Sequence, residues 1–327
     1  MTVASEIRER TVSVNGIDLH VVEAGPVDGS PVILCHGFPE LAYSWRHQIP
    51  ALADAGYRVV APDQRGYGRS SSPADIADYD IVHLTGDLVG LLDDLGHEQA
   101  VFVGHDWGSM VVWSLALRHA ARVAGVVGMS VPFIPRGARP PTESMRFLLG
   151  DAFFYMLYFQ EPGVADADLG ADPVRFLRRM MAGIGNRGLT PEAMMSMFAN
   201  DGRGFVDRLP EPDGLPAWLR QDELDHYAAE FARTGFTGAV NWYRNLDRNW
   251  QLTPDFDGVK VGVPARFIGG VDDPVLLMTP PSVQDGLLAD DRGTVVIDGA
   301  GHWVQQEKPA EVNAALLEFL GGLEPGW

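Results

Sequence analysis

The sequence is poor in cysteine and lysine. Cys35 is the only cysteine among 327 residues, so no disulfide can form within the chain. It ends the apolar run Pro31–Cys35, which predicts a buried, unreactive thiol and not a cysteine nucleophile. Lysine occurs only at Lys260 and Lys308, arginine supplying the other basic side chains, and we give that bias no functional weight.

Long apolar runs and positive charge are scarce as well. No uncharged apolar stretch reaches about 18 residues, which predicts no membrane span. The N-terminus MTVASEIRER has neither the basic region nor the apolar core of a secretion signal, so we expect a cytoplasmic protein. The 44 acidic and 25 basic side chains give a formal net charge of -19, which argues against nucleic acid or an anionic membrane as a partner. The oligomeric state is left open, a homodimer included.

Motifs for metals and nucleotides are also missing. No H-E-x-x-H or paired Cys/His spacing occurs, so we expect no metal site. Gly66-Tyr-Gly68 is not a dinucleotide fingerprint because Ser71 stands where the last glycine should be, and there is no P-loop. The sequence therefore predicts chemistry without a cofactor.

What the chain does contain is a regular alternation of short strands and helices, after an antiparallel start. The Asn15-Gly16 pair between two alternating segments predicts a hairpin over residues 11–22. The later pattern predicts a mostly parallel sheet flanked by helices. Strands are expected at Val32–Cys35, Arg58–Ala61, Ala100–Val103, Val123–Met129, Pro264–Gly270 and Gly293–Asp298, and helices at Trp45–Ala55, His83–Leu95, Trp107–Ala120 and Ala310–Leu320.

The alternation stops after Ser130-Val-Pro132. The following stretch, to about Pro254, is rich in Met, Phe, Arg and Pro and has helical but no clear strand periodicity. We therefore expect a helical cap domain, residues 133–254, inserted into one α/β core formed by residues 1–132 and 255–327.

The most informative stretch is Val101-Phe-Val-Gly-His-Asp-Trp-Gly-Ser109. A buried-strand run breaks there into a turn and continues as a helix, with Gly104 and Gly108 on either side of Asp106. This is the pattern of a nucleophile elbow, with a carboxylate in place of the usual serine. A capping aspartate in a glycine-rich turn would look the same, so the other groups must decide.

A carboxylate nucleophile forms a covalent ester, and a general base is needed to hydrolyse it. His302 follows the last expected strand in a loop, which satisfies the chain order nucleophile, acid, histidine. An acid to orient its imidazole should follow the preceding strand, which ends in Asp272 and Asp273. We favour Asp273 and interpret Asp272 as a solvated charge.

The same reasoning places an oxyanion hole around Asp106. The loop His36-Gly-Phe-Pro39 follows the first parallel strand, so the backbone N–H groups of Phe38 and Trp107 should both face the nucleophile. Each such donor typically contributes about 2.7–4 kcal/mol once negative charge develops. His36 and His105 are assigned to the turns themselves.

These segments together resemble the epoxide hydrolases of the α/β-hydrolase fold family, and the resemblance covers about residues 10–320. The motifs that carry it are His36-Gly-Phe-Pro39, Asp63-Gln-Arg-Gly-Tyr-Gly-Arg-Ser70, Gly104-His-Asp-Trp-Gly108, Gly270-Val-Asp-Asp273 and Gly301-His-Trp303. It implies an α/β-hydrolase fold with a helical cap, and hydrolysis of an epoxide to a vicinal diol through an ester on Asp106.

The resemblance extends into the cap. Tyr155-Met-Leu-Tyr-Phe-Gln-Glu-Pro-Gly163 and Asn241-Trp-Tyr-Arg-Asn245 resemble the segments that supply two tyrosines in soluble epoxide hydrolases, which implies Tyr155 and Tyr243 as donors to the epoxide oxygen. A phenol, with a pKa of about 10, can donate a proton to a departing alkoxide. Tyr158 is a rival for Tyr155, because it lies three residues further along the same helix.

The substrate expected from these residues is a small lipophilic epoxide, with water as the second reactant. Apolar residues next to the expected catalytic groups should bind it, namely Phe38, Trp107, Phe159, Leu276 and Trp303. The sequence leaves regiochemistry, enantioselectivity and the physiological substrate open.

Two other functions fit the same motifs. A haloalkane dehalogenase would use the same nucleophile and base, but usually has a second halide donor in the first loop or the lid, and this chain has Phe38 in that loop. Trp107, where fluoroacetate dehalogenases carry arginine, argues against a small anionic substrate. A non-catalytic ligand-binding member of the fold is the third reading, and the intact set of catalytic groups argues against it.

Overall fold

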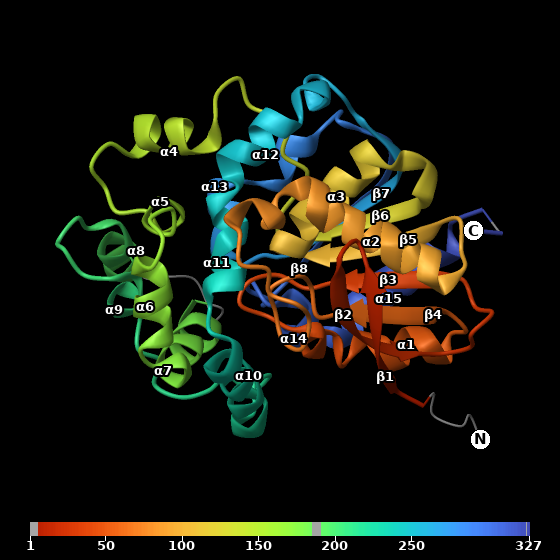
Figure 1. Ribbon diagram of the computed structural model, residues 1–327, viewed down its shortest axis with the longest axis horizontal. Helices are drawn as coiled ribbons and strands as arrows, with labels where there is room; N and C mark the ends of the chain where they lie inside the picture. The colour runs from red at the N-terminus through yellow and green to blue at the C-terminus, as the bar shows by residue number, and fades with distance from the viewer. Residues whose placement is uncertain (1–5, 185–190, 325) are drawn as a thin grey trace.

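The protein is built on one eight-stranded sheet with helices on both faces and a group of helices beyond one end (Figure 1). The computed structural model describes residues 6–184, 191–324 and 326–327. The strand order is β1-β2-β4-β3-β5-β6-β7-β8. The strands are β1 (Arg8–Val14), β2 (Ile17–Ala24), β3 (Pro31–Cys35), β4 (Arg58–Pro62), β5 (Ala100–His105), β6 (Val123–Met129), β7 (Val261–Gly270) and β8 (Leu288–Ile297).

The predicted hairpin and parallel core are both present. Asn15 and Gly16 have φ values of 47° and 78°, the left-handed backbone that a two-residue hairpin turn requires. Strand β2 is antiparallel to β1 and β4, whereas β3, β4, β5, β6, β7 and β8 pair in parallel. This is the mostly parallel α/β sheet expected from the strand spacing.

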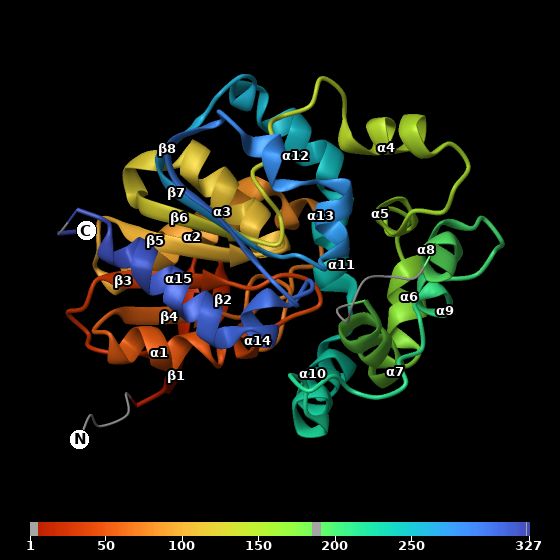
Figure 2. The same cartoon turned by 180° about the vertical axis from the view of Figure 1, so that it is seen from behind.

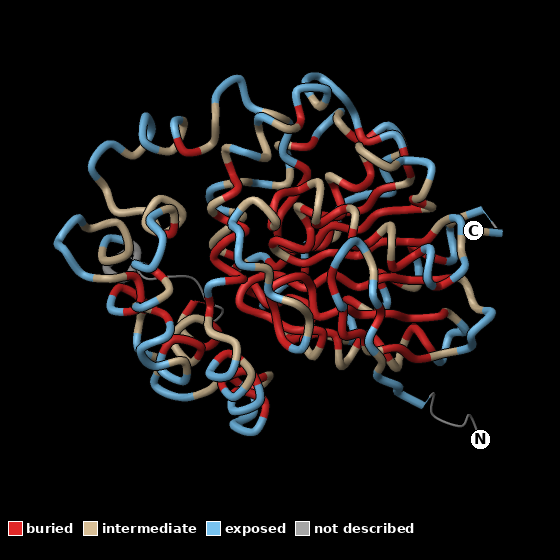
Figure 3. The backbone as a smooth tube through the Cα atoms, in the orientation of Figure 1, coloured by how far each residue is buried: buried red, intermediate tan, exposed pale blue. Residues whose placement is uncertain are grey.

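Helices cover both faces of the sheet because its central strands are apolar on both sides. Val32 and Leu34 belong to one buried cluster, while Ile33 between them belongs to the other. Figure 2 shows the molecule from behind, with the face of the sheet that is turned away in Figure 1. Figure 3 shows that the buried residues are concentrated along the strands. On the face of Ile33, the cluster includes helices α2 (Ile81–Leu95) and α3 (Trp107–Arg118). On the face of Val32 and Leu34, it includes α1 (Gln48–Asp54) and α15 (Pro309–Gly321).

Between β6 and β7 the described residues contain helices and no strand. Figure 1 shows α4 to α10 gathered beyond the sheet, with α11 and α12 next to it. These helices are α4 (Pro141–Leu149), α5 (Tyr155–Tyr158), α6 (Val164–Gly170), α7 (Pro173–Arg178), the π-helical η4 (Arg179–Ile184), α8 (Pro191–Phe198), α9 (Phe205–Arg208), α10 (Gln221–Thr234), α11 (Thr237–Arg244) and α12 (Leu246–Leu252).

Helix α11 is held against the core by a close backbone contact. A Cβ atom on Gly238 would lie 2.5 Å from the carbonyl oxygen of Gly66, so neither backbone leaves room for a side chain there. Four residues further on, the indole N–H of Trp242 donates to the carbonyl oxygen of Arg65 at 3.0 Å. This contact fixes α11, and with it Tyr243, relative to the loop that follows β4.

Several predicted boundaries differ from the structure, and two of the differences have a clear physical cause. The helix expected from Trp45 to Ala55 is divided into η1 (Ala42–Trp45) and α1, because Pro50 fits only the first turn of a helix. Strand β8 begins at Leu288, five residues before the expected start, since its first half is a charged and exposed edge without apolar alternation.

The remaining elements are short. In the part of the chain that is described, no helix has the length and apolar character needed to cross a bilayer. The short helices are η2 (Ile76–Tyr79), η3 (Ala120–Arg122), η5 (Pro254–Phe256), α13 (Pro274–Met278), η6 (Pro281–Gln284) and α14 (Val304–Glu307).

Candidate active site

Asp106 lies on a strained turn between β5 and α3. Its φ and ψ are 51° and -116°, an unfavourable backbone for a residue with a Cβ atom. The turn closes only because its flanking residues are glycines: a Cβ on Gly104 would lie 2.2 Å from the carbonyl oxygen of Gly108, and one on Gly108 would lie 2.0 Å from that of Cys35. The turn therefore has the geometry of a nucleophile elbow.

The two carboxylate oxygens of Asp106 have different partners. Oδ1 accepts a hydrogen bond from the backbone N–H of Phe38 at 2.8 Å. Oδ2 lies 3.6 Å from Nε2 of His302. Trp107 is the first residue of α3, so its backbone N–H has no acceptor within the helix. Of the two amide groups expected to form the oxyanion hole, that of Phe38 therefore donates to the carboxylate, and that of Trp107 directly follows Asp106 at the start of α3.

His302 lies between two carboxylates. Its Nδ1 is 3.1 Å from each carboxylate oxygen of the buried Asp273, while Nε2 faces Asp106. Asp273 is itself fixed, because Oδ1 also accepts from the N–H of Val275 at the start of α13. The structure therefore brings Asp106, His302 and Asp273 together in the predicted order.

The neighbouring charges determine the protonation of His302. Burial disfavours its charged form, but Asp273 and Asp106 together outweigh that effect and raise the pKa of His302 well above its usual value. The two carboxylates therefore favour the protonated form of the His302 ring. Loss of the charge on Asp106 would remove one of the two carboxylates that raise the pKa of His302, and this pKa would fall.

Tyr155 and Tyr243 project from the cap helices α5 and α11 towards Asp106. The ring of Tyr243 lies 5.0 Å from Trp107 and 5.3 Å from Phe38, and 5.8 Å from the ring of Tyr155, measured between centroids. Burial raises the pKa of both phenols, and the charge of Asp106 raises it further. Both hydroxyls are therefore protonated at neutral pH and close enough to Asp106 to be affected by its charge.

Tyr158, the rival of Tyr155, has a different environment. Its hydroxyl donates to Asp168 at 3.2 Å. Burial and the charge of Asp168 raise the pKa of Tyr158 to about 12, and Asp106 has no part in that shift. The geometry favours Tyr155 as the residue facing the elbow.

The five apolar residues expected to bind substrate fall into two groups. Phe38, Trp107 and Phe159 contact the tyrosine pair, Phe159 with its ring 5.0 Å from Tyr243. The other two lie elsewhere: Trp303 packs on the His302 ring at 4.8 Å and donates its indole N–H to the cap residue Met181, and Leu276 lies against Gly269 of β7.

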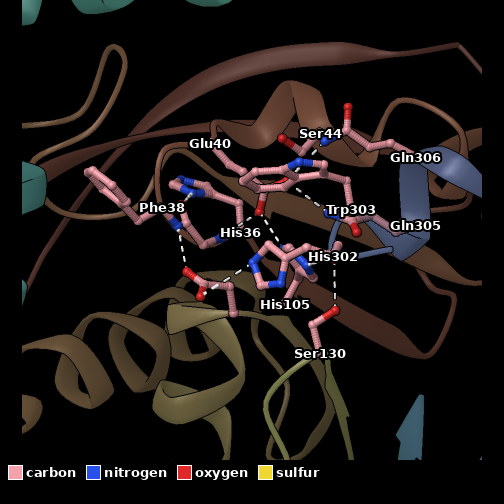
Figure 4. Close-up of polar contacts among 12 residues, drawn as sticks. His36, Phe38, Glu40, Ser44, His105, Ser130, His302, Trp303, Gln305 and Gln306 are labelled. Carbon is pink, nitrogen blue, oxygen red and sulfur yellow. Dashed lines mark hydrogen bonds and ion pairs between the residues drawn. The ribbon is translucent and has the colours of Figure 1, made fainter. Parts of the chain in front are cut away.

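A buried network behind the elbow, drawn in Figure 4, was not predicted from the sequence. Glu40, fully buried, accepts hydrogen bonds from Nδ1 of His105 at 2.6 Å and from the backbone N–H of Gly37 at 2.9 Å. Its other oxygen accepts from the side-chain amides of Gln305 and Gln306 at 2.8 and 3.0 Å. One carboxylate thus joins the oxyanion loop, the elbow and the helix after the histidine loop.

His105 connects this network to His302. Its Nε2 lies 2.7 Å from the backbone carbonyl oxygen of His302, which also accepts from the hydroxyl of Ser130 at 2.8 Å. Burial would raise the pKa of Glu40, but the ion pair with His105 outweighs it and lowers this pKa to about 2. Both acceptors of His105 therefore require an N–H, so its ring carries both protons.

A sequence signal for this network did exist. Glu40 stands between the apolar residues Phe38-Pro39 and Leu41-Ala42. A charged residue in such an apolar segment is expected to be buried, and a buried charge needs a partner.

The described residues contain no group of three or more His, Cys, Asp or Glu side chains arranged to hold a metal ion.

Comparisons with known proteins agree with this geometry. The family model described as alpha/beta hydrolase fold matches residues 30–309. The chain is 60% identical to epoxide hydrolase A of Mycobacterium tuberculosis over 97% of its length and 98% of that protein, and 40% identical to epoxide hydrolase 3 of Siraitia grosvenorii over 96% and 98%. The crystal structure of epoxide hydrolase A from Mycobacterium thermoresistibile is 57% identical and superposes with a TM-score of 0.94, covering 98% of this chain and 99% of that one.

Proposed function

The chain belongs to the α/β-hydrolase family and is an epoxide hydrolase, and from this premise we propose how its own residues carry out the reaction. In the first half-reaction an oxygen of Asp106 attacks a ring carbon of the epoxide. A carbon–oxygen bond forms to the carboxylate as the ring carbon–oxygen bond breaks, which leaves a hydroxyalkyl ester.

The two oxygens of Asp106 have separate tasks. Oδ2 has no backbone donor, so it is the better nucleophile and becomes the ester oxygen. Oδ1, held by the N–H of Phe38, becomes the ester carbonyl oxygen. The fixed donor therefore already lies where negative charge will develop in the second half-reaction.

Tyr155 and Tyr243 protonate the departing oxygen. An alkoxide is a far stronger base than a phenolate, so a phenol can donate to it in the transition state. The raised pKa of both tyrosines keeps their protons in place until the epoxide opens. We assign the donor role to Tyr155 and not to Tyr158, whose hydroxyl is bonded to Asp168.

Ester formation prepares the base for the second half-reaction. Once Asp106 is an ester, His302 has lost one of the two charges that stabilise its proton, and its pKa falls. The proton that His302 loses and the proton that the phenolate of the first half-reaction regains are exchanged through solvent. Neutral His302, oriented by Asp273 through Nδ1, then removes a proton from water at Nε2. The hydroxide attacks the ester carbonyl carbon, and the N–H groups of Phe38 and Trp107 stabilise the oxyanion. The bond from this carbon to the alkyl oxygen then breaks as the imidazolium gives its proton to that oxygen, which releases the diol and restores Asp106.

A single observation carries this proposal: the carboxylate of Asp106, on its strained turn, faces the N–H of Phe38 with one oxygen and the His302–Asp273 pair with the other. The aromatic residues around the tyrosine pair support a lipophilic epoxide as substrate. We further propose residues 133–254 as the cap on a core of residues 1–132 and 255–327, a cytoplasmic location and, as an assembly to be tested, a homodimer.

The test is trapping of the ester. The purified variant His302→Gln is mixed with a panel of lipophilic epoxides and haloalkanes, its intact mass is recorded, and any adduct is located by peptide mapping. We expect a mass gain equal to a whole epoxide on the peptide that contains Asp106, and no adduct with His302→Gln/Asp106→Ala.

Other outcomes would point elsewhere. Addition of an alkyl group with release of halide would indicate a haloalkane dehalogenase. Diol turnover by Asp106→Ala alone would refute the covalent mechanism. Ligand binding without an adduct across the whole panel would refute the assignment of Asp106 for these substrates.

A further inference from the structure

One carboxylate holds the backbone on both sides of His302. Glu307 is the last residue of the short helix α14, and its side chain turns back over the loop that precedes the helix. Oε2 accepts from the N–H of Gly301 at 2.8 Å, and Oε1 accepts from the N–H of Trp303 at 2.9 Å. The two amides before and after the base are therefore fixed by a single side chain.

The remaining constraints on His302 act on other atoms. Asp273 binds its Nδ1, whereas His105 and Ser130 both donate to its carbonyl oxygen. None of these contacts holds the amides of the flanking residues, and the loop has no regular secondary structure of its own. Only the Glu307 carboxylate fixes those two N–H groups among the contacts described.

We propose that Glu307 is a positioning residue for ester hydrolysis: by bridging the amides of Gly301 and Trp303, it holds Nε2 of His302 at the distance from Asp106 that activation of water requires. Glu307 touches neither the nucleophile nor the tyrosines, so it acts through the loop. This inference rests on the assignment of His302 as the base in the proposed function.

The bridge depends on the charge of Glu307. An ionised carboxylate offers acceptors to both amides, but a protonated one places its O–H where an acceptor is needed. Burial raises the pKa of Glu307 to about 7, against the effect of the two amide donors, while the charge of His302 lowers this pKa and that of Asp273 raises it. The bridge is therefore complete above about pH 7 and weakens as the pH falls below that value.

The variant Glu307→Gln tests the role, since its amide can accept from one N–H but presents an NH2 group to the other. Rapid-quench kinetics with an epoxide measures ester formation and ester hydrolysis separately. We expect ester formation to stay within about twofold of the wild-type rate, and ester hydrolysis to slow by about tenfold to a hundredfold, as for a displaced catalytic group. The intact first step also reports that the variant is folded.

The pH profile gives a second readout. In the wild-type enzyme the rate of ester hydrolysis should decline as the pH falls through about 7. Glu307→Gln should lack the part of this decline that belongs to Glu307 and keep only the part set by protonation of His302. Glu311→Gln is the matched control, because Glu311 is an exposed glutamate in the first turn of α15. We expect it to behave as wild type in both steps.

Three results would overturn the inference. They are ester hydrolysis by Glu307→Gln at the wild-type rate, an equal slowing of both steps, and an unchanged pH profile. The His302→Gln variant in the same assay separates this failure from that of the proposed function. If His302→Gln accumulates ester and Glu307→Gln does not slow its hydrolysis, only the role of Glu307 is refuted; if His302→Gln accumulates none, the assignment of the base is refuted.

Discussion

The ring of His105 donates a hydrogen bond from Nε2 to the backbone carbonyl oxygen of His302 at 2.7 Å. The residue before the nucleophile thus holds the residue that carries the base. Because Glu40 binds the other nitrogen of the same ring, the relative position of elbow and base depends on one buried ion pair.

Removal of that carboxylate should destabilise the protein. Glu40→Ala leaves the buried imidazolium of His105 without its counter-ion, a loss that typically lowers the free energy of unfolding by about 3–5 kcal/mol. Urea denaturation measures it, with the exposed Glu311→Ala as control, expected within about 0.5 kcal/mol of wild type. A loss below about 1 kcal/mol for Glu40→Ala would contradict a charged pair.

The same pair should make the protein sensitive to acid. Since the pKa of Glu40 is lowered from 4.5 to about 2 on folding, its contribution to stability is complete above pH 4.5 and is lost as the pH falls towards 2. The unfolding free energy of the wild-type protein should therefore fall more steeply over this interval than that of Glu40→Ala. Parallel pH profiles for the two proteins would contradict this assignment.

The two tyrosines of the cap can be distinguished from Tyr158 by substitution. Tyr155→Phe and Tyr243→Phe should each slow ester formation, by about 10- to 100-fold because the other phenol still donates, and the double variant should form almost no ester. Tyr158→Phe, which loses only a bond to Asp168, is the matched control. Slower ester formation in Tyr158→Phe than in Tyr155→Phe would reverse the assignment.

The proton on His302 should respond to the charge of Asp106. In Asp106→Asn, which imitates the uncharged ester, the pKa of His302 should be lower than in wild type, and imidazole 15N chemical shifts measure it. Because the wild-type pKa is raised above 6.5, this interaction stabilises the fold fully below pH 6.5 and is lost as the pH rises through the folded pKa. An unchanged pKa would refute the proposed release of the proton on ester formation.

The contact between Gly66 and Gly238 should control the position of Tyr243. Gly238→Ala forces the α11 backbone away from Gly66, an overpacking that typically costs about 1–3 kcal/mol, and should slow ester formation more than ester hydrolysis. Gly214→Ala in the cap is the control, because a Cβ atom there meets nothing within 4 Å. Equal effects of both variants on the first step would refute this role of the contact.

Features that depend on residues close together in the sequence, such as strands, turns and helices, could be predicted from local patterns. The antiparallel start, the parallel strands, the strand–turn–helix at Asp106 and the helical stretch between β6 and β7 follow from the Asn-Gly turn, apolar runs, glycine spacing and the loss of strand periodicity. Strand β8 was predicted too short, because a charged edge strand has no apolar alternation to reveal it.

Contacts between segments that lie far apart in the sequence could not be predicted, because local patterns carry no information on which segments meet. The pairing of Glu40 with His105 could not be predicted, since the two lie 65 residues apart in the chain and only the fold brings them within 2.6 Å. Choosing between Tyr155 and Tyr158 likewise required the position of Asp168. Trp303, expected to bind substrate, packs on the His302 ring and donates its indole N–H to the carbonyl oxygen of Met181, two contacts that local sequence does not reveal.

The hydrogen bond between His105 and His302 joins residues 197 positions apart in the chain. At about 5–20 residues per second, a ribosome needs about 10 to 40 s to synthesise the segment between them. During that time the emerging chain already contains its nucleophile but not yet its base. The order of synthesis therefore keeps the nascent enzyme inactive towards complete turnover until the loop around His302 has been made and docked.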